Sequence, residues 1–137
     1  MKLLTEIPPK YPVRRPEVLA AAVSALSHGD WARLEGAPET EAALREFHGG
    51  GEIWWVASGT AALEAILLGH GIGPGDEVIT VPYTWGATIA AVLAVGAVPV
   101  FADVDPITGL MNPGTVPPLI GPRTKAILAV HLFGRPC

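Results

Sequence analysis

The strongest chemical signal in the sequence is a small-residue turn between a β-rich run and a helical run. Ser58, Gly59 and Thr60 follow Ile53–Ala57 and lead into Thr60–Gly69, whose apolar spacing is that of a helix. Gly59 permits close approach of a ligand to the backbone. The first N–H groups of a helix lack intrahelical partners and lie at the positive end of its dipole, which suits a phosphate. The alternative is that Ser58 or Thr60 only caps the helix.

A second signal is an aromatic side chain after the next predicted strand, Glu77–Val81. Trp85 stands in the segment Pro82–Thr88, at the carboxyl end of that strand. Open α/β sheets bind ligands at this edge, and an indole there can lie against a flat heteroaromatic ring. The alternative is that Trp85 fills the core at the start of an apolar helix that ends at Val95. Taken together, the two signals predict a ligand with a phosphate and an aromatic ring.

Alternating strands and helices position these residues. The apolar spacing predicts helices over Pro16–Ser27, Pro38–Phe47, Thr60–Gly69 and Thr84 or Trp85 to Val95. It predicts strands over Ile53–Ala57, Glu77–Val81, Val98–Val104 and Lys125–Leu132. This order indicates βαβ crossovers and a mainly parallel sheet, and so an α/β fold. Between residues 112 and 118, any helix is expected to be short, because an interior proline costs about 3 kcal/mol.

Composition and charge exclude several classes of protein. The chain has 137 residues, of which 50% are hydrophobic and 16% charged, so we expect an ordered domain with a sizeable core. A net charge of -4 without a basic stripe argues against a nucleic-acid or anionic-membrane partner. Cys137 is the only cysteine, which excludes an internal disulfide and a multi-cysteine metal site. The proline-broken N-terminus is no signal peptide, so a cytoplasmic protein is expected.

One uncharged stretch offers a competing interpretation as a membrane span. Residues 78–102 contain 25 positions without a charge, which is long enough to cross a bilayer. Pro82, Gly86, Gly96 and Pro99 divide the stretch into pieces of strand and helix length. A buried α/β unit gives the same uncharged run, because parallel strands are covered on both faces, and this second interpretation is preferred.

Five strings, in their order and spacing, resemble the DegT/DnrJ/StrS family: SGTAAL, GIGPGDEVITVPYTW, GAVPVFADVDPITG, PRTKAI and HLFGRP. The resemblance runs from Trp31 to Cys137. Members of this family are pyridoxal-phosphate-dependent aminotransferases that mostly act on keto-sugars, nucleotide-linked keto-sugars or related cyclic ketones. The resemblance implies the N-terminal part of the large domain of a fold type I transferase, with a mainly parallel sheet and flanking helices. It also implies an N-terminal helical arm over residues 1–50 and a partial cofactor-binding domain over residues 51–137.

The resemblance also implies roles for residues of the two signals. Ser58, Gly59 and Thr60 are expected to hold the phosphate of pyridoxal 5'-phosphate, and Trp85 is expected to stack on its pyridine ring. Gly29–Leu34 is similar to a loop near the family's site, although a solvated connector is the alternative. The expected partners are a small-molecule keto-sugar, an amino-acid donor and, because the family's site lies at a dimer interface, a second copy of the protein.

The residues that would carry out amino transfer are not found in this sequence. The chemistry needs a lysine that binds the cofactor covalently and a carboxylate that keeps the pyridine nitrogen protonated. Lys2 and Lys10 lie in a proline-broken tail, and Lys125 matches the PRTKAI string. Asp103 and Asp105 match the DVDP turn, so no catalytic residue is assigned. We expect the chain to be truncated and inactive alone, and unstable or aggregating because strands that pair with its own are absent.

These residues are compatible with three functions. The first is an aminotransferase, the second a dehydratase of the same family with histidine in place of the lysine, and the third a non-catalytic α/β binding module. The sequence that follows in the same reading frame would distinguish the three. A Glu-Asp-Ala motif followed by Ser-x-x-Lys would indicate the aminotransferase, a histidine at the lysine position the dehydratase, and neither of these the module.

Overall fold

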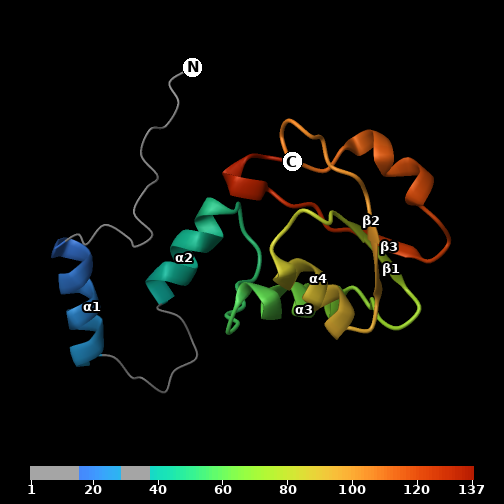
Figure 1. Cartoon of the computed structure of the whole chain (residues 1–137). Coiled ribbons are helices and arrows are strands. Elements are labelled where there is room, and N and C mark those ends of the chain that lie inside the picture. The colour runs from blue at the N-terminus through green and yellow to red at the C-terminus, as the bar shows by residue number, and fades with distance from the viewer. Residues whose placement is uncertain (1–15, 29–37) are drawn as a thin grey trace. The chain divides into compact units, whose positions relative to one another are not determined.

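The computed structural model describes residues 16–28 and 38–137 (Figure 1). Contacts divide the chain into two compact units, Met1–Trp55 and Val56–Cys137. The domain limits 1–50 and 51–137 that were expected from the sequence stay predictions. Gly29–Leu34, Lys2 and Lys10, which the sequence singled out, lie outside the described residues.

The first unit contains helix α1, Pro16–His28, and helix α2, Pro38–Phe47, as predicted. Each begins at a proline, whose fixed φ suits the first helical position and whose missing N–H costs nothing there. After α2 the chain turns through glycines 49–51, which all have positive φ. Trp55 Nε1 donates to Glu41 Oε1 at 2.7 Å.

The predicted strand over Ile53–Ala57 is wrong. Residues 51–56 have no regular secondary structure, and Ala57 and Ser58 form a bend. A strand needs a neighbour for its backbone groups, and this segment pairs with no strand in the part of the chain that the structure describes. Trp54 is 84% exposed, so the apolar run that indicated a strand buries little of its surface.

The second unit is built on a three-stranded sheet in the order β2-β1-β3. Strand β1, Glu77–Thr80, pairs in parallel with β2, Val98–Phe101, and with β3, Thr124–Ile127. Helix α3, Gly59–Gly69, precedes β1, and helix α4, Gly86–Ala94, connects β1 to β2. The parallel sheet with flanking helices confirms the predicted α/β class.

The central strand β1 supplies both faces of the core, because side chains alternate along a strand. Val78 is fully buried in one cluster with Leu67 of α3 and Val92 of α4. Ile79 and Val81 point to the other face, where they pack with Ala102, Met111 and Val116. Helices α3 and α4 lie side by side over the first face (Figure 1).

Two predicted strands are shorter than expected. Strand β2 ends at Phe101, and Val104 instead forms an isolated antiparallel bridge with Met111. Strand β3 ends at Ile127, and the 3-10 turn η3, Leu132–Gly134, follows it. The proline-rich segment forms only two 3-10 turns, η1 (Pro113–Thr115) and η2 (Pro117–Leu119), as the prolines predicted.

The uncharged stretch over residues 78–102 is divided among β1, α4 and β2. Among the described residues, no helix is long and apolar enough to cross a membrane. The α/β interpretation of this stretch is therefore confirmed.

Candidate functional site

The start of α3 and the start of α4 lie at the same edge of the sheet. Leu67 near the end of α3 lies in one core cluster with Val92 and Val95 at the end of α4, so the two helices run in the same direction. Helix α4 begins six residues after Thr80, the last residue of β1. Because the two helices also pack against each other, their first turns lie at one edge of the sheet (Figure 1). The predicted phosphate turn and Trp85 stand at these two helix starts.

Ser58 is the N-cap of α3. Its backbone is extended, and its Oγ accepts the Ala61 N–H at 3.2 Å. The first backbone bond of the helix runs from the Ala62 N–H to the Ser58 carbonyl at 3.0 Å. The capping interpretation is therefore confirmed for Ser58. Because its hydroxyl oxygen accepts that bond, its hydrogen stays free to donate to a ligand.

The next two N–H groups, those of Gly59 and Thr60, have no acceptor in the described part of the chain. The Thr60 hydroxyl likewise has no partner there. The first turn of α3 contains no acidic residue that would compete with an anion. A Cβ built on Gly59 would meet no atom within 4 Å, so no neighbouring atom crowds this side of the glycine. This donor set fits a phosphate ester at the positive end of the helix dipole.

Trp85 is the N-cap of α4 and makes no side-chain capping bond. Its side chain is 82% exposed, so the alternative that it fills the core is wrong. The indole of Trp85 makes no hydrogen bond or ring contact within residues 16–28 and 38–137. The exposed indole can therefore accept a flat ring against its face.

Two threonines beside Trp85 were not identified from the sequence. The hydroxyl groups of Thr84 and Thr88 are 2.9 Å apart, and Thr88 is buried. The Thr88 N–H also donates to the Trp85 carbonyl at 3.0 Å. These bonds fix the turn that carries the indole. Two threonines four positions apart at a predicted helix start are the signal that could have indicated this pair.

The other ionisable residues named in the sequence are not part of these two helix starts. Lys125 is in the middle of β3, and Asp103 and Asp105 follow β2. Asp105 accepts the N–H groups of Ile107 and Thr108 at 2.9 and 2.8 Å. Hydrogen bonds from Thr108 and then Ile107 hold the pKa of Asp105 below its ordinary value, because they stabilise the carboxylate. The hydrogen bonds of the Asp105 carboxylate therefore stabilise its own loop.

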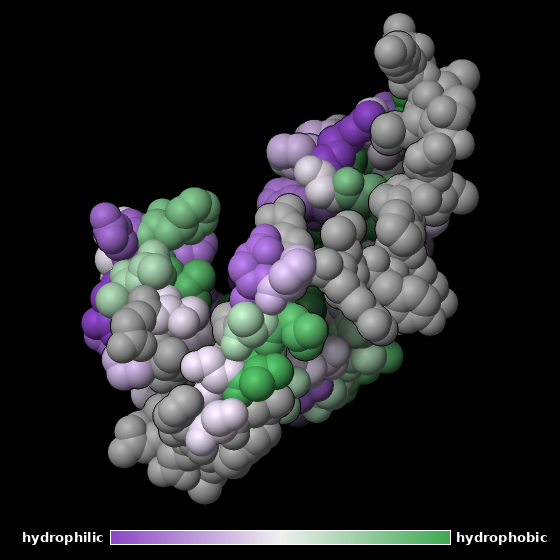
Figure 2. All heavy atoms as spheres, turned by 90° about the vertical axis from the view of Figure 1, so that its left-hand side faces the viewer, coloured by the Kyte–Doolittle hydropathy of each residue, from purple (hydrophilic) through white to green (hydrophobic). Residues whose placement is uncertain are grey.

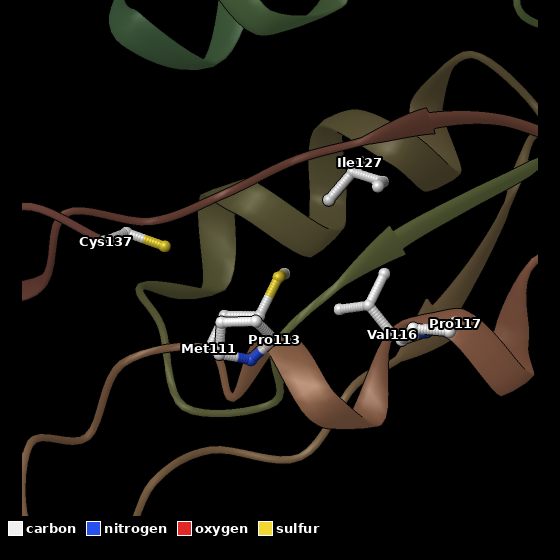
Figure 3. A pocket seen from close by; sticks show the side chains of 6 residues that line it. All are labelled: Met111, Pro113, Val116, Pro117, Ile127 and Cys137. Carbon is white, nitrogen blue, oxygen red and sulfur yellow. The ribbon is translucent and has the colours of Figure 1, made fainter.

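An apolar hollow of about 280 Å³ lies beside β3 and η1, and Figure 3 shows the side chains around it. Its lining residues are Met111, Pro113, Val116, Pro117, Ile127 and Cys137. The Met111 thioether and the Ile127 side chain point toward one another across it (Figure 3). None of these side chains carries a charge, so the hollow has no group that would hold a phosphate. Hydrophobic and hydrophilic residues also lie next to one another on the surface that Figure 2 presents.

Residues 13–137 match the sequence profile of the DegT/DnrJ/EryC1/StrS aminotransferase family. A UDP-2-acetamido-2-deoxy-3-oxo-D-glucuronate aminotransferase of Pseudomonas aeruginosa is 41% identical over 110 residues, which cover 80% of this chain. An L-glutamine:2-deoxy-scyllo-inosose aminotransferase of Micromonospora echinospora is 42% identical over 132 residues, which cover 91% of this chain. The chain spans 31% of the length of each of these relatives.

Solved structures show the same fold. NtdA of Bacillus subtilis, which was solved with bound cofactor PMP, has a TM-score of 0.75 and 32% sequence identity. The match covers 89% of this chain and 29% of that one. At this identity the likeness extends to family as well as to fold.

Proposed function

Because the chain belongs to the DegT/DnrJ/EryC1/StrS aminotransferase family, we propose that it binds pyridoxal 5'-phosphate for an amino-transfer reaction. The amino group comes from an amino acid. Its acceptor is a keto-sugar, a nucleotide-linked keto-sugar or a related cyclic ketone. On the same resemblance, the whole protein is proposed to be a cytoplasmic homodimer.

The observation that carries the proposal is the set of free donors at the start of α3. The N–H groups of Gly59 and Thr60 and the Thr60 hydroxyl all lack protein acceptors among the described residues. A phosphate dianion accepts several such bonds, and charge-assisted bonds are the stronger kind. Ser58 contributes its hydroxyl hydrogen while its oxygen keeps the helix capped.

The exposed indole of Trp85 supports the ring half of the proposal. When bound, the cofactor supplies an electron-withdrawing ring to the reaction. Trp85 covers one face of that ring, which orients it and excludes water from that side. The Thr84–Thr88 hydroxyl pair holds the turn on which the indole stands. In this account Ser58, Gly59 and Thr60 bind one end of the cofactor and Trp85 the other.

The test compares two cofactor forms that differ only in the phosphate. Pyridoxamine 5'-phosphate and pyridoxamine are suitable because neither has an aldehyde that would react with surface lysines. Isothermal titration measures their dissociation constants for the wild type, for Thr60→Val and for Thr40→Val, an exposed threonine in α2. A hydrogen bond to a charged group contributes about 1.5–3 kcal/mol, so Thr60→Val should reduce the affinity for pyridoxamine 5'-phosphate by about tenfold or more.

The affinity for pyridoxamine should not change in Thr60→Val, and Thr40→Val should leave both affinities unchanged. Equal affinities of the two compounds for the wild type would contradict the proposed phosphate site. Amino transfer itself needs the lysine that this sequence does not contain, so it is measured in the whole protein, as conversion of pyridoxal phosphate to pyridoxamine phosphate that depends on an added amino acid.

A further inference from the structure

Three loops at the carboxyl edge of the sheet enclose a hollow that no part of the proposed cofactor site uses. Its volume is about 440 Å³. The loop after β1 contributes Tyr83 to its lining. The loop after β2 contributes Pro106, Ile107 and Thr108, and the segment after β3 contributes Leu132, Phe133 and Arg135. This is the sheet edge at which open α/β sheets bind ligands.

The wall that follows β2 is held in one shape by its own hydrogen bonds. Asp105 Oδ1 accepts the N–H groups of Ile107 and Thr108, and the Asp105 carbonyl accepts the Gly109 N–H at 2.8 Å. The Asp105 N–H donates to the Leu110 carbonyl at 2.9 Å, which closes the loop. This wall of the hollow is therefore preorganised in the absence of a ligand.

Gly109 lets this wall approach the loop after β1. Its φ is +71°, and a Cβ at this position would lie 3.1 Å from Tyr83 Cε1 and 3.6 Å from Leu132 Cδ2. A side chain here would require the Tyr83 ring to shift by a few tenths of an ångström, and the positive φ would add backbone strain. The contact thus joins the loops into one surface and leaves the Tyr83 ring in its wall.

Arg135 is the charged side chain that lines the hollow. Among the described residues, no carboxylate lies within ion-pair distance of its guanidinium. The Asp105 carboxylate in the same wall accepts hydrogen bonds from its own loop. The phenol of Tyr83 and the hydroxyl of Thr108 add polar groups. The Thr108 hydroxyl accepts the Leu110 N–H at 3.3 Å, whereas the Tyr83 hydroxyl has no hydrogen-bond partner among the described residues.

Two of the apolar side chains in the lining are strongly exposed. Ile107 is 89% exposed and Phe133 is 90% exposed. Phe133 also has a φ of +55°, a left-handed conformation that is uncommon for a non-glycine residue and that clusters at ligand sites. The hollow therefore combines one unpaired cation, polar groups and exposed apolar contacts.

We propose that this hollow binds an organic anion, with Arg135 holding its phosphate or carboxylate and Ile107 and Phe133 contacting its carbon skeleton. Guanidinium binds both kinds of anion through paired N–H groups. The inference rests on the proposed function for its two sources of anion, the phosphate of a nucleotide-linked sugar and the carboxylate of an amino-acid donor. It adds a second site beside the cofactor.

The test titrates the protein with UDP, L-glutamate and inorganic phosphate, each at low ionic strength. Arg135→Gln should weaken binding of UDP or of glutamate by about tenfold or more, which corresponds to a charge-assisted bond of at least about 1.4 kcal/mol. Weaker binding of UDP would identify the phosphate of a nucleotide as the anion that Arg135 holds. Weaker binding of glutamate would identify the carboxylate of an amino-acid donor. Arg135→Lys keeps the charge without the planar fork and should give a smaller loss.

Arg123→Gln is the matched control, because Arg123 precedes β3 at the opposite edge of the sheet and pairs with Glu77 at 2.6 Å. Three results would overturn the inference: an equal loss in this control, unchanged affinities in Arg135→Gln, or binding of inorganic phosphate alone. Arg135→Gln should leave the affinity for pyridoxamine 5'-phosphate unchanged. Failure of the second site is therefore distinguishable from failure of the proposed function.

Discussion

Helices α3 and α4 begin at the same edge of the sheet, but their first turns differ. At α3 Ser58 caps the helix, and the N–H groups of Gly59 and Thr60 stay without acceptors among the described residues. Gly59 has no side chain that could cover them. At α4 the N-cap is Trp85, which makes no side-chain capping bond and stands exposed. One helix start presents donors and the other presents an aromatic face.

The starts of α3 and α4 are both positive ends of helix dipoles, but this difference gives them separate functions. A helix start attracts an anion when its donors are accessible, and α3 meets that condition. An indole binds a ring whether or not the ring carries a phosphate. Changes at α3 should therefore act only on the phosphate form of a ligand, and changes at Trp85 should act on both forms.

The largest effect is expected from a negative charge placed at the first position of α3. Gly59→Asp has room, because a Cβ at Gly59 meets no atom within 4 Å. The carboxylate would occupy the anion position and repel a phosphate, so the affinity for pyridoxamine 5'-phosphate should fall about 100-fold, or about 2.7 kcal/mol. An acidic residue in a first turn stabilises a helix by about 0.3–1 kcal/mol, so the melting temperature should not fall.

Gly86→Asp is the matched control for this change, because it also alters the first residue of a helix at this edge and has the same free space. It should stabilise its helix similarly and reduce the affinity for the phosphate form less than Gly59→Asp does. Equal losses from the two variants would mean that the starts of α3 and α4 do not differ in the way described.

Removal of the indole is expected to have the next largest effect. Stacking of a base on an aromatic side chain contributes about 1–3 kcal/mol, and Trp85→Ala should lose a comparable amount of ring binding, or about tenfold in affinity. Pyridoxamine and pyridoxamine 5'-phosphate should be weakened by the same factor. Trp54→Ala, which removes an indole that is 84% exposed, should change neither affinity. A loss confined to the phosphate form would contradict the assignment of Trp85 to the ring.

Loss of the α3 cap should affect stability more clearly than binding. Ser58→Ala removes the acceptor of the Ala61 N–H and should lower the free energy of unfolding by about 1 kcal/mol, as N-cap substitutions do. Chemical denaturation measures this change. Ser58→Gly should cost only a few tenths of a kcal/mol, because glycine is itself tolerated at an N-cap. A Ser58→Ala protein as stable as the wild type would show that the capping bond contributes nothing.

The smallest effect is expected at the threonine pair beside Trp85. Thr88→Val removes one of two hydroxyl groups that lie 2.9 Å apart while keeping the shape of the side chain. The free energy of unfolding should fall by about 0.5 kcal/mol, the lower end for a hydrogen bond, because water can replace the lost partner of Thr84. If the Thr84–Thr88 pair positions the indole of Trp85, the affinity for pyridoxamine should also fall in Thr88→Val. An unchanged affinity for pyridoxamine would show that the pair does not position the indole.

Much of the local structure could be predicted from the sequence. Pro16 and Pro38 begin their helices where the fixed φ of proline predicts, and the prolines at 113, 117 and 118 limit their segment to 3-10 turns. Ser58 caps its helix as its residue type indicates. These features depend on neighbours close in sequence, which is why the residue types alone predict them.

Features that depend on distant neighbours were predicted less well. Ile53–Ala57 has the composition of a strand, but composition does not supply a pairing partner. The exposure of Trp85 could not be decided, because an apolar helix start is equally compatible with a buried indole. The hollow around Arg135 was not predicted at all, since it requires the contact of Gly109 with Tyr83 and Leu132 across three loops.

The most direct test of the account is the ratio of the dissociation constants of pyridoxamine and pyridoxamine 5'-phosphate, measured in the wild type and in Gly59→Asp. Two charge-assisted bonds to the phosphate predict a wild-type ratio of about 100 or more. The ratio should fall to about 1 in Gly59→Asp, because the added carboxylate removes the advantage of the phosphate. A wild-type ratio near one, or a large ratio that Gly59→Asp leaves unchanged, would contradict a phosphate site at the start of α3.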